Sequence, residues 1–75
     1  MKEREWLRSI RNYKFLTQED VATKANISRS YYTRIESGTQ TPSIDVAKRV
    51  ASVLIFDWAI FFEDECSLKE QKRLA

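Results

Sequence analysis

The sequence contains no histidine and a single cysteine, Cys66. Without histidine, the usual zinc sites and the catalytic triads that use a histidine base are excluded, and one cysteine cannot form a disulfide within the chain. Cys66 lies in an acidic stretch, which does not favour a reactive thiolate. The composition therefore predicts no enzyme activity, no metal site and no cofactor.

Long apolar runs are also missing. Ser52 and Asp57 interrupt residues 50–62, so no segment reaches the roughly 18 apolar residues that a membrane-spanning helix requires. The first residues are charged and show no apolar signal-peptide core, so we expect a cytoplasmic protein with no membrane partner. A chain of 75 residues, 43% hydrophobic and 32% charged, is typical of one small soluble domain.

Short polar residues stand where helices are expected to start, because their side chains accept hydrogen bonds from the free N–H groups of a first turn. In chain order they are Thr17, Ser28, Ser43 and Asp57. Asn26 and Gly38, which favour the left-handed conformation of a helix end, follow the second and third segments. With the apolar spacing, these signals predict helices over residues 2–13, 18–25, 29–37, 44–54 and 58–62.

The fourth of these segments has apolar residues at helical spacing, so we expect them to be buried along one face. They are Ile44, Ala47, Val50, Ala51 and Leu54. The end of the sequence is hydrophilic. We therefore expect a folded domain over residues 1–62 and a polar tail over residues 63–75.

Residues 17–38 have the layout of a helix-turn-helix, with two short helices, a tight polar turn between them and a closing glycine. The charges between residues 21 and 35 are all basic, namely Lys24, Arg29 and Arg34. A run of one sign indicates a polyanionic partner, although a solvated surface is the alternative. The pattern favours DNA binding.

A set of motifs runs in order through residues 4–62. They are Leu7, Arg11, Leu16, Thr17, Gln18, Val21, Ala22, I-S-R-S at 27–30, I-E-S-G at 35–38, Pro42, Ser43, Ala47, Ala51 and Leu54. In this order they resemble the helix-turn-helix domain of the phage repressor and Cro type, often called the Xre family. The resemblance implies an all-α fold, a compact five-helix bundle in which the third helix enters the major groove of DNA.

The resemblance also implies individual roles. The positions that read base edges are Arg29, Ser30, Thr33 and Arg34. The positions that contact the DNA backbone are Gln18, Ser28, Tyr31, Thr39, Gln40 and Thr41. An arginine in the major groove can bind guanine O6 and N7 with two hydrogen bonds, so we expect a G·C pair in each half-site. The alternatives are solvated or phosphate-binding arginines, a plain first-turn polar residue at position 18 and a lid over the core at position 31.

Arg11 and Glu36 match a structural ion pair of this family, which would set the angle of the reading helix. The family usually has glycine where this sequence has Phe15, Asn26 and Ile55. Asparagine adopts a left-handed conformation cheaply, whereas phenylalanine and isoleucine do not. Either these turns have a different shape here, or their backbone is strained.

The expected partner is double-stranded DNA, bound by a homodimer, because one domain reads only half of a pseudo-palindromic operator. Apolar residues near the C-terminal end exceed what a small core can hide, unless they simply cap it. The candidates for the dimer interface are Val53, Ile55, Trp58, Ile60 and Phe62. The expected function is a bacterial or phage transcriptional regulator that acts as a repressor. The alternative is an antitoxin or protein-interaction module, with a protein partner bound through the tail.

Overall fold

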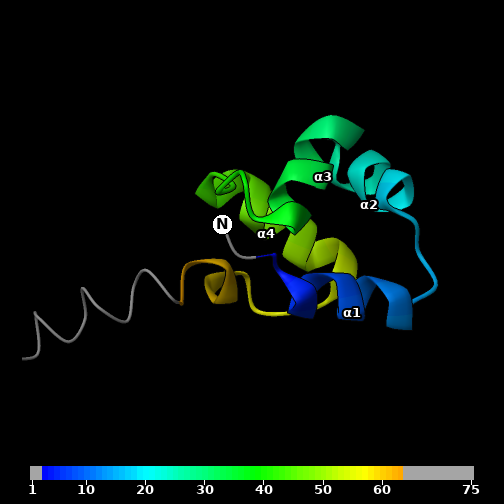
Figure 1. Ribbon diagram of the computed structural model, residues 1–75, viewed down its shortest axis with the longest axis horizontal. Helices are drawn as coiled ribbons and strands as arrows, with labels where there is room; N and C mark the ends of the chain where they lie inside the picture. The colour runs from blue at the N-terminus through cyan, green and yellow to red at the C-terminus, as the bar shows by residue number, and fades with distance from the viewer. Residues whose placement is uncertain (1–2, 64–75) are drawn as a thin grey trace, which may run out of the picture.

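The computed structural model describes residues 3–63, and all regular structure in that range is helical. Its elements are α1 (Glu5–Tyr13), α2 (Gln18–Ala25), α3 (Arg29–Ser37), α4 (Ile44–Leu54) and η1 (Trp58–Phe62). In Figure 1, α2 and α3 lie side by side above α1, and α4 runs through the middle. The predicted all-α class is confirmed. None of the helices within residues 3–63 is both long and apolar enough to cross a membrane.

The last predicted helix is a 3₁₀ helix and not an α-helix, which corrects the expected count of five α-helices to four plus η1. η1 is capped by Asp57, whose carboxylate accepts a hydrogen bond from the N–H of Ala59 at 3.1 Å. So short a segment can form few α-type bonds, and the tighter helix is typical of such pieces. Most of the predicted polar tail, residues 64–75, lies outside the described residues.

The predicted caps start α2, α3 and α4 at the expected residues. Thr17 and Asp20 form a reciprocal capping box, with each side chain accepting from the other's backbone N–H at 3.0 and 2.9 Å. Ser28 Oγ accepts from the N–H of Tyr31, and Ser43 Oγ caps α4 in the same way. Each of these bonds satisfies an N–H group that has no partner inside its own helix.

Helix α1 starts later than predicted, at Glu5. The backbone N–H of Arg4 donates to the carbonyl of Glu36 at 2.9 Å, and the Arg4 guanidinium donates to the carbonyl of Ile35 at 2.6 Å. These contacts hold the chain before α1 against the end of α3. The residue spacing alone did not show them, because they join positions far apart in the sequence.

The backbone is left-handed at all three positions where the sequence departs from glycine. Phe15, Asn26 and Ile55 have φ angles of 59°, 61° and 62°, while Gly38 has 89°. The turns therefore keep the shape that glycine would favour. Asparagine tolerates it, but Phe15 and Ile55 carry a backbone strain of about 1–2 kcal/mol each.

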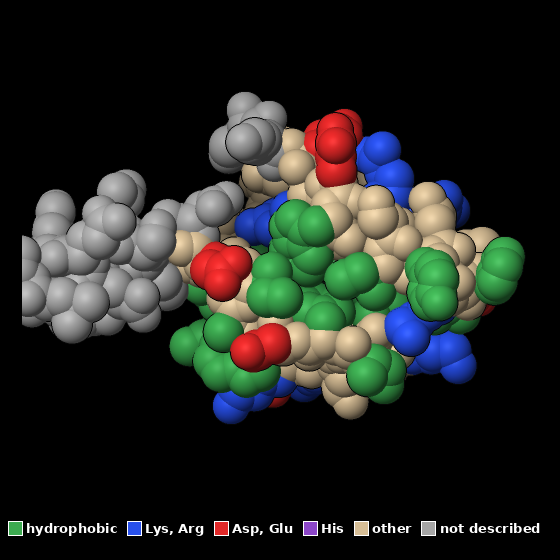
Figure 2. Space-filling model, turned by 90° about the horizontal axis from the view of Figure 1, so that it is seen from below, with side chains coloured by type: hydrophobic (Ala, Val, Ile, Leu, Met, Phe, Trp, Pro, Cys, Tyr) green, Lys and Arg blue, Asp and Glu red, His purple; other side chains and the backbone are tan. Residues whose placement is uncertain are grey.

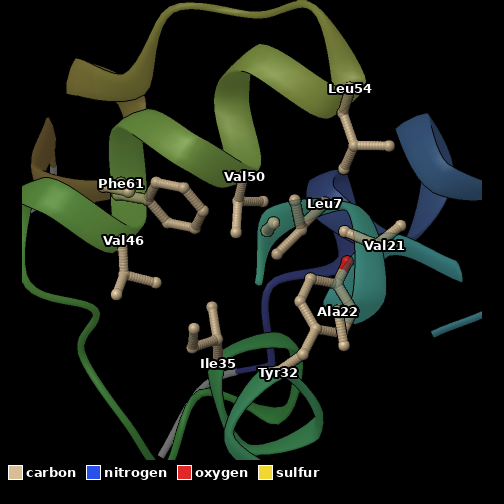
Figure 3. Close-up of a cluster of buried hydrophobic side chains, with 11 residues drawn as sticks. Leu7, Val21, Ala22, Tyr32, Ile35, Val46, Val50, Leu54 and Phe61 are labelled. Atoms are coloured by element: carbon tan, nitrogen blue, oxygen red, sulfur yellow. The ribbon is translucent and has the colours of Figure 1, made fainter. Parts of the chain in front are cut away.

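The core lies between α4 and the other helices (Figure 3). Its largest fully buried side chains are Leu7, Val21, Tyr32, Ile35, Val50 and Leu54. Tyr32 and Ile35 come from α3 and leave that helix with one buried and one exposed face. Burying apolar surface stabilises a fold by about 25 cal/mol per Å². Tyr32 and Ile35 therefore hold the buried face of α3 against the core.

One predicted core residue is wrong. Ile44 is 56% exposed, and Val46 is buried in its place. The buried face of α4 follows Val46, Ala47, Val50, Ala51 and Leu54. Ile44 is the first residue of α4, at the edge of that face, and its side chain stays mostly in solvent where the core no longer covers the helix end.

Candidate nucleic-acid interface

The four predicted base-reading residues share the exposed face of α3. They are Arg29, Ser30, Thr33 and Arg34, and together they line one open hollow on the surface. The spacing of one, three and one residues places them on adjacent turns of the helix. The structure thus brings together a compact polar surface with two guanidinium groups.

The charges of this surface are available to a ligand. Arg29 Nη1 lies 3.9 Å from Glu19 Oε1, but both side chains are largely exposed, so water screens this weak pair. Arg34 forms no ion pair within residues 3–63. The two arginines can therefore turn toward an anion at little cost.

A buried ion pair lies beneath the reading face. Glu36 is only 2% exposed, and its carboxylate receives two hydrogen bonds from Arg11, Nε to Oε2 at 2.7 Å and Nη2 to Oε1 at 3.0 Å. The Arg11 Nη1 group also donates to the carbonyl of Leu16 at 2.9 Å. Arg11 thereby joins α1, the turn before α2 and the end of α3. Such a planar, two-pronged contact fixes orientation as well as distance.

Two further side chains donate hydrogen bonds to Glu36, and Arg8 Nε lies 3.9 Å from its Oε1 atom. The Tyr32 hydroxyl donates to Oε2 at 2.8 Å, and Gln18 Nε2 donates to Oε1 at 2.9 Å. Burial by itself raises the pKa of Glu36, but the hydrogen bonds from Arg11, Gln18 and Tyr32 outweigh it and lower the pKa below its ordinary value. Glu36 is therefore charged although it is buried.

Gln18 connects this network to the reading face. Its Oε1 atom accepts a hydrogen bond from Thr33 Oγ1 at 2.9 Å, while its Nε2 atom holds Glu36. The sequence indicated a first-turn residue able to brace a reading position. It did not indicate Tyr32 as a member of the network, although the i, i+4 spacing of Tyr32 and Glu36 on α3 was a usable signal.

The loop after α3 is ordered by its own hydrogen bonds. The N–H groups of Thr39 and Gln40 both donate to the carbonyl of Arg34, at 3.1 and 3.2 Å. These two N–H groups are therefore occupied within the chain. The Thr39 hydroxyl and the Gln40 amide also form hydrogen bonds within the chain, to the carbonyls of Arg34 and Thr41 at 3.4 and 3.3 Å. The side chains of Thr39 and Thr41 are exposed, and Gln40 is half-buried.

The sequence model of the helix-turn-helix family matches residues 7–60, a range that begins within α1 and ends within η1. This range covers the caps, the reading face and the buried ion pair described above. The chain belongs to the helix-turn-helix family. It is of the phage repressor and Cro type that the motif order resembled. Membership makes this helix-turn-helix protein a DNA-binding transcriptional regulator.

Relatives agree with the family assignment. The chain is 53% identical over 64 residues to the uncharacterized HTH-type transcriptional regulator YqaF of Bacillus subtilis (strain 168), a match that covers 85% of this chain and 84% of the relative. It is 35% identical over 66 residues to the immunity repressor protein of Bacillus phage phi105. That match covers 88% of this chain but only 46% of the phage protein, so the chain spans about half its length.

The helix-turn-helix protein also carries an apolar surface away from α3. Figure 2 shows hydrophobic side chains gathered on the face seen from below, where α1 and η1 lie. Of the dimer-interface candidates, Val53, Trp58, Ile60 and Phe62 are half-buried and Ile55 is 75% exposed. Trp58 and Phe62 pack edge to face, with ring centroids 6.1 Å apart. These rings thus cap the core on one side and meet solvent on the other.

Proposed function

We propose that the protein regulates transcription by inserting α3 into the major groove of an operator and reading bases with Arg29, Ser30, Thr33 and Arg34. One observation carries this proposal. The four side chains share the exposed face of α3, and a buried network fixes that helix against α1 and α2. The major groove, about 12 Å wide, accepts such a helix.

The DNA backbone contacts belong to residues around the ends of α2 and α3. We assign them to Gln18, Ser28, Tyr31, Thr39, Gln40 and Thr41. Tyr31 is half-buried and packs against the core with one side, which leaves its other side for a sugar or phosphate. Contacts of this kind set register and orientation without reading sequence.

We assign repression by occupancy of a pseudo-palindromic operator to a homodimer. The immunity repressor relative supports repression over activation. The dimer is supported by an apolar surface, formed by Val53, Ile55, Trp58, Ile60 and Phe62. η1, which carries three of these residues, lies to the side of α3 in Figure 1. Pairing through this surface leaves both reading helices free, and an isologous contact of one patch with itself gives the two-fold symmetry of a palindrome.

The test is selection of duplexes from a random pool, followed by affinity measurements across salt concentration. We expect an enriched pseudo-palindrome with a G·C pair in each half-site. Arg29→Ala and Arg34→Ala should each lower specific affinity by about 10- to 100-fold and relax the preference at one base position. Lys14→Ala, an exposed cation outside α3, is the matched control and should change affinity little. Unchanged selection and an unchanged salt slope in both arginine variants would refute the reading role.

A further inference from the structure

A second open hollow lies between α2 and α4, separate from the one on α3. Its lining includes the cations Lys24, Lys48 and Arg49 together with the apolar Val53. Lys24 belongs to the last turn of α2, and the other three residues belong to α4. The base-reading residues do not contribute to it. The family assignment leaves this basic hollow without a role.

The cations of the hollow exceed the acids that they pair with. Arg49 forms an ion pair with Asp45 one turn earlier, at 2.8 Å. Lys24 and Lys48 form no ion pair within residues 3–63. Lys48 Nζ instead lies over the ring of Trp58, 5.2 Å from its centroid. Two positive charges therefore remain to attract an acidic ligand.

The lysine side chains, and not the local backbone, must attract the ligand of this hollow. α2 ends here, where Asn26 adopts the left-handed conformation that closes the helix. The C-terminal end of a helix carries partial negative charge, which opposes any anion. Phosphate sites typically use the free N–H groups of a helix N-terminus, and no helix start lines this hollow. Carboxylates can pair with lysine ammonium groups alone, so they are the ligand that this lining suits.

The sequence itself contains such a ligand next to the dimer candidates. Glu63 directly follows η1 and is followed by Asp64 and Glu65. Val53 lines the hollow, and Trp58, the first residue of η1, lies under Lys48. The hollow thus borders the apolar surface, and in the sequence the acidic stretch directly follows Phe62, the last residue of that surface. Glu63 forms no ion pair with the hollow of its own chain.

We propose that this hollow binds the acidic stretch starting at Glu63 of a second copy of the chain, an inference that rests on the homodimer proposed above. The two-fold symmetry of such a dimer repeats the contact, so that each hollow receives the partner's carboxylates. The apolar surface supplies the contact area, and the charge pairs set its orientation and select a like partner.

Charge reversal tests the pairing. One variant combines Lys24→Glu with Lys48→Glu, and the other combines Glu63→Lys, Asp64→Lys and Glu65→Lys. In the homodimer of either variant, each hollow faces an acidic or basic stretch that carries the same sign of charge as the hollow. The dimer dissociation constant should therefore rise by about tenfold or more at low salt, and high salt should remove this effect. Sedimentation equilibrium measures it, and Lys14→Glu, outside the hollow, should leave the constant unchanged. Insensitivity of both variants would overturn the proposal.

Mixing the two variants shows where the ligand comes from. In the heterodimer each hollow again faces the opposite charge, so the mixture should dimerise as tightly as the wild-type protein. If the acidic stretch bound its own chain, both partners would stay repulsive and mixing would restore nothing, which would refute the contact between copies. The chain that carries all five substitutions should also recover dimerisation.

Binding to a single half-site separates this proposal from the proposed function. We expect the Lys24→Glu, Lys48→Glu variant to bind a half-site duplex with wild-type affinity and salt slope. A loss there would make the hollow a DNA contact and overturn the inference. A wild-type chain that stays monomeric at all concentrations would refute both the dimer and this contact. Base reading that depends on Arg29 and Arg34 would still stand.

Discussion

Glu36 keeps its negative charge in an almost fully buried position because three side chains donate hydrogen bonds to it. Arg11, Gln18 and Tyr32 come from three different helices, so the carboxylate is the point at which α1, α2 and α3 are held together. Removing one partner of a buried charge pair leaves the other unpaired, which is far costlier than losing an exposed pair.

The charge of Glu36 should make stability fall in acid. The folded-state pKa of Glu36 lies below its ordinary value of 4.5, so the contribution is complete above about pH 4.5 and is lost as pH falls through the folded-state pKa. Glu36→Gln should flatten this fall. At pH 7 it should also lower the free energy of unfolding by about 3 kcal/mol, because Arg11 loses its charged partner. Urea unfolding between pH 7 and acid measures both.

A second carboxylate accompanies Glu36 in acid. The pKa of Asp20 is lowered by its hydrogen bonds with Thr17, so part of the acid dependence should remain in the Glu36→Gln variant. An identical acid profile in the wild-type and Glu36→Gln proteins would show that folding does not lower the pKa of Glu36.

The strain at Phe15 gives a second prediction for a single residue. Its φ is 59° and its side chain is 93% exposed, so the residue has a conformational cost and little burial to offset it. Phe15→Gly should raise the free energy of unfolding by about 0.5–1 kcal/mol, since glycine adopts this conformation freely but gains entropy when unfolded. Phe15→Ala keeps the strain and is the matched control. A glycine variant no more stable than the alanine variant would contradict the strain. Thermal unfolding distinguishes them.

The helices α3 and α4 are both capped by a serine side chain, but they have different roles in the fold. Ser28 and Ser43 each accept a hydrogen bond from an N–H three residues later, at 3.0 and 3.2 Å. α3 presents the proposed reading face, whereas α4 is buried along one side in the core. Removing each cap in turn therefore distinguishes a loss of helix stability from a loss of DNA contact.

Ser28→Ala and Ser43→Ala should each cost about 1 kcal/mol of stability, because each leaves a first-turn N–H without its partner. Only Ser28→Ala should weaken binding of operator DNA, since the start of α3 lies at the proposed backbone contact. Urea unfolding and titration of labelled duplex measure the two effects. Equal affinity in both variants would limit Ser28 to capping.

For the whole molecule, a monomer and a dimer are expected to differ in their affinity for a palindromic operator. Linking two reading domains makes the second half-site contact intramolecular, which raises affinity for the palindrome without changing either α3 contact. Ile55 is the most exposed of the interface candidates, at 75%. Burial of the Ile55 side chain within one chain therefore does little to offset the strain of its left-handed backbone.

Ile55→Asp should therefore abolish dimerisation and remove the advantage of the palindrome over a single half-site, while affinity for one half-site stays near the wild-type value. A buried aspartate at an apolar interface would be desolvated without a partner. Ile44→Asp, at another exposed isoleucine, should keep the dimer. Light scattering and titration of both duplexes report the result, and a dimeric Ile55→Asp protein would place the interface elsewhere.

The sequence by itself determined the elements whose causes are local. The caps at Thr17, Ser28 and Ser43 act within three residues, so the starts of α2, α3 and α4 could be predicted, and so could the end at Asn26. The exposed face of α3 followed from helical spacing and needed no knowledge of the neighbouring helices. The roles of its side chains on DNA remain predictions.

Only the tertiary structure decided the features that depend on contacts between residues far apart in the sequence. Helix α1 starts at Glu5 because Arg4 bonds to the end of α3, and α4 buries Val46 and not Ile44 where it packs against α2 and η1. It also placed Gln18 between Thr33 and Glu36, and Lys24 beside the lysine and arginine of α4. These arrangements depend on how the helices pack against one another, which local propensity and spacing do not specify.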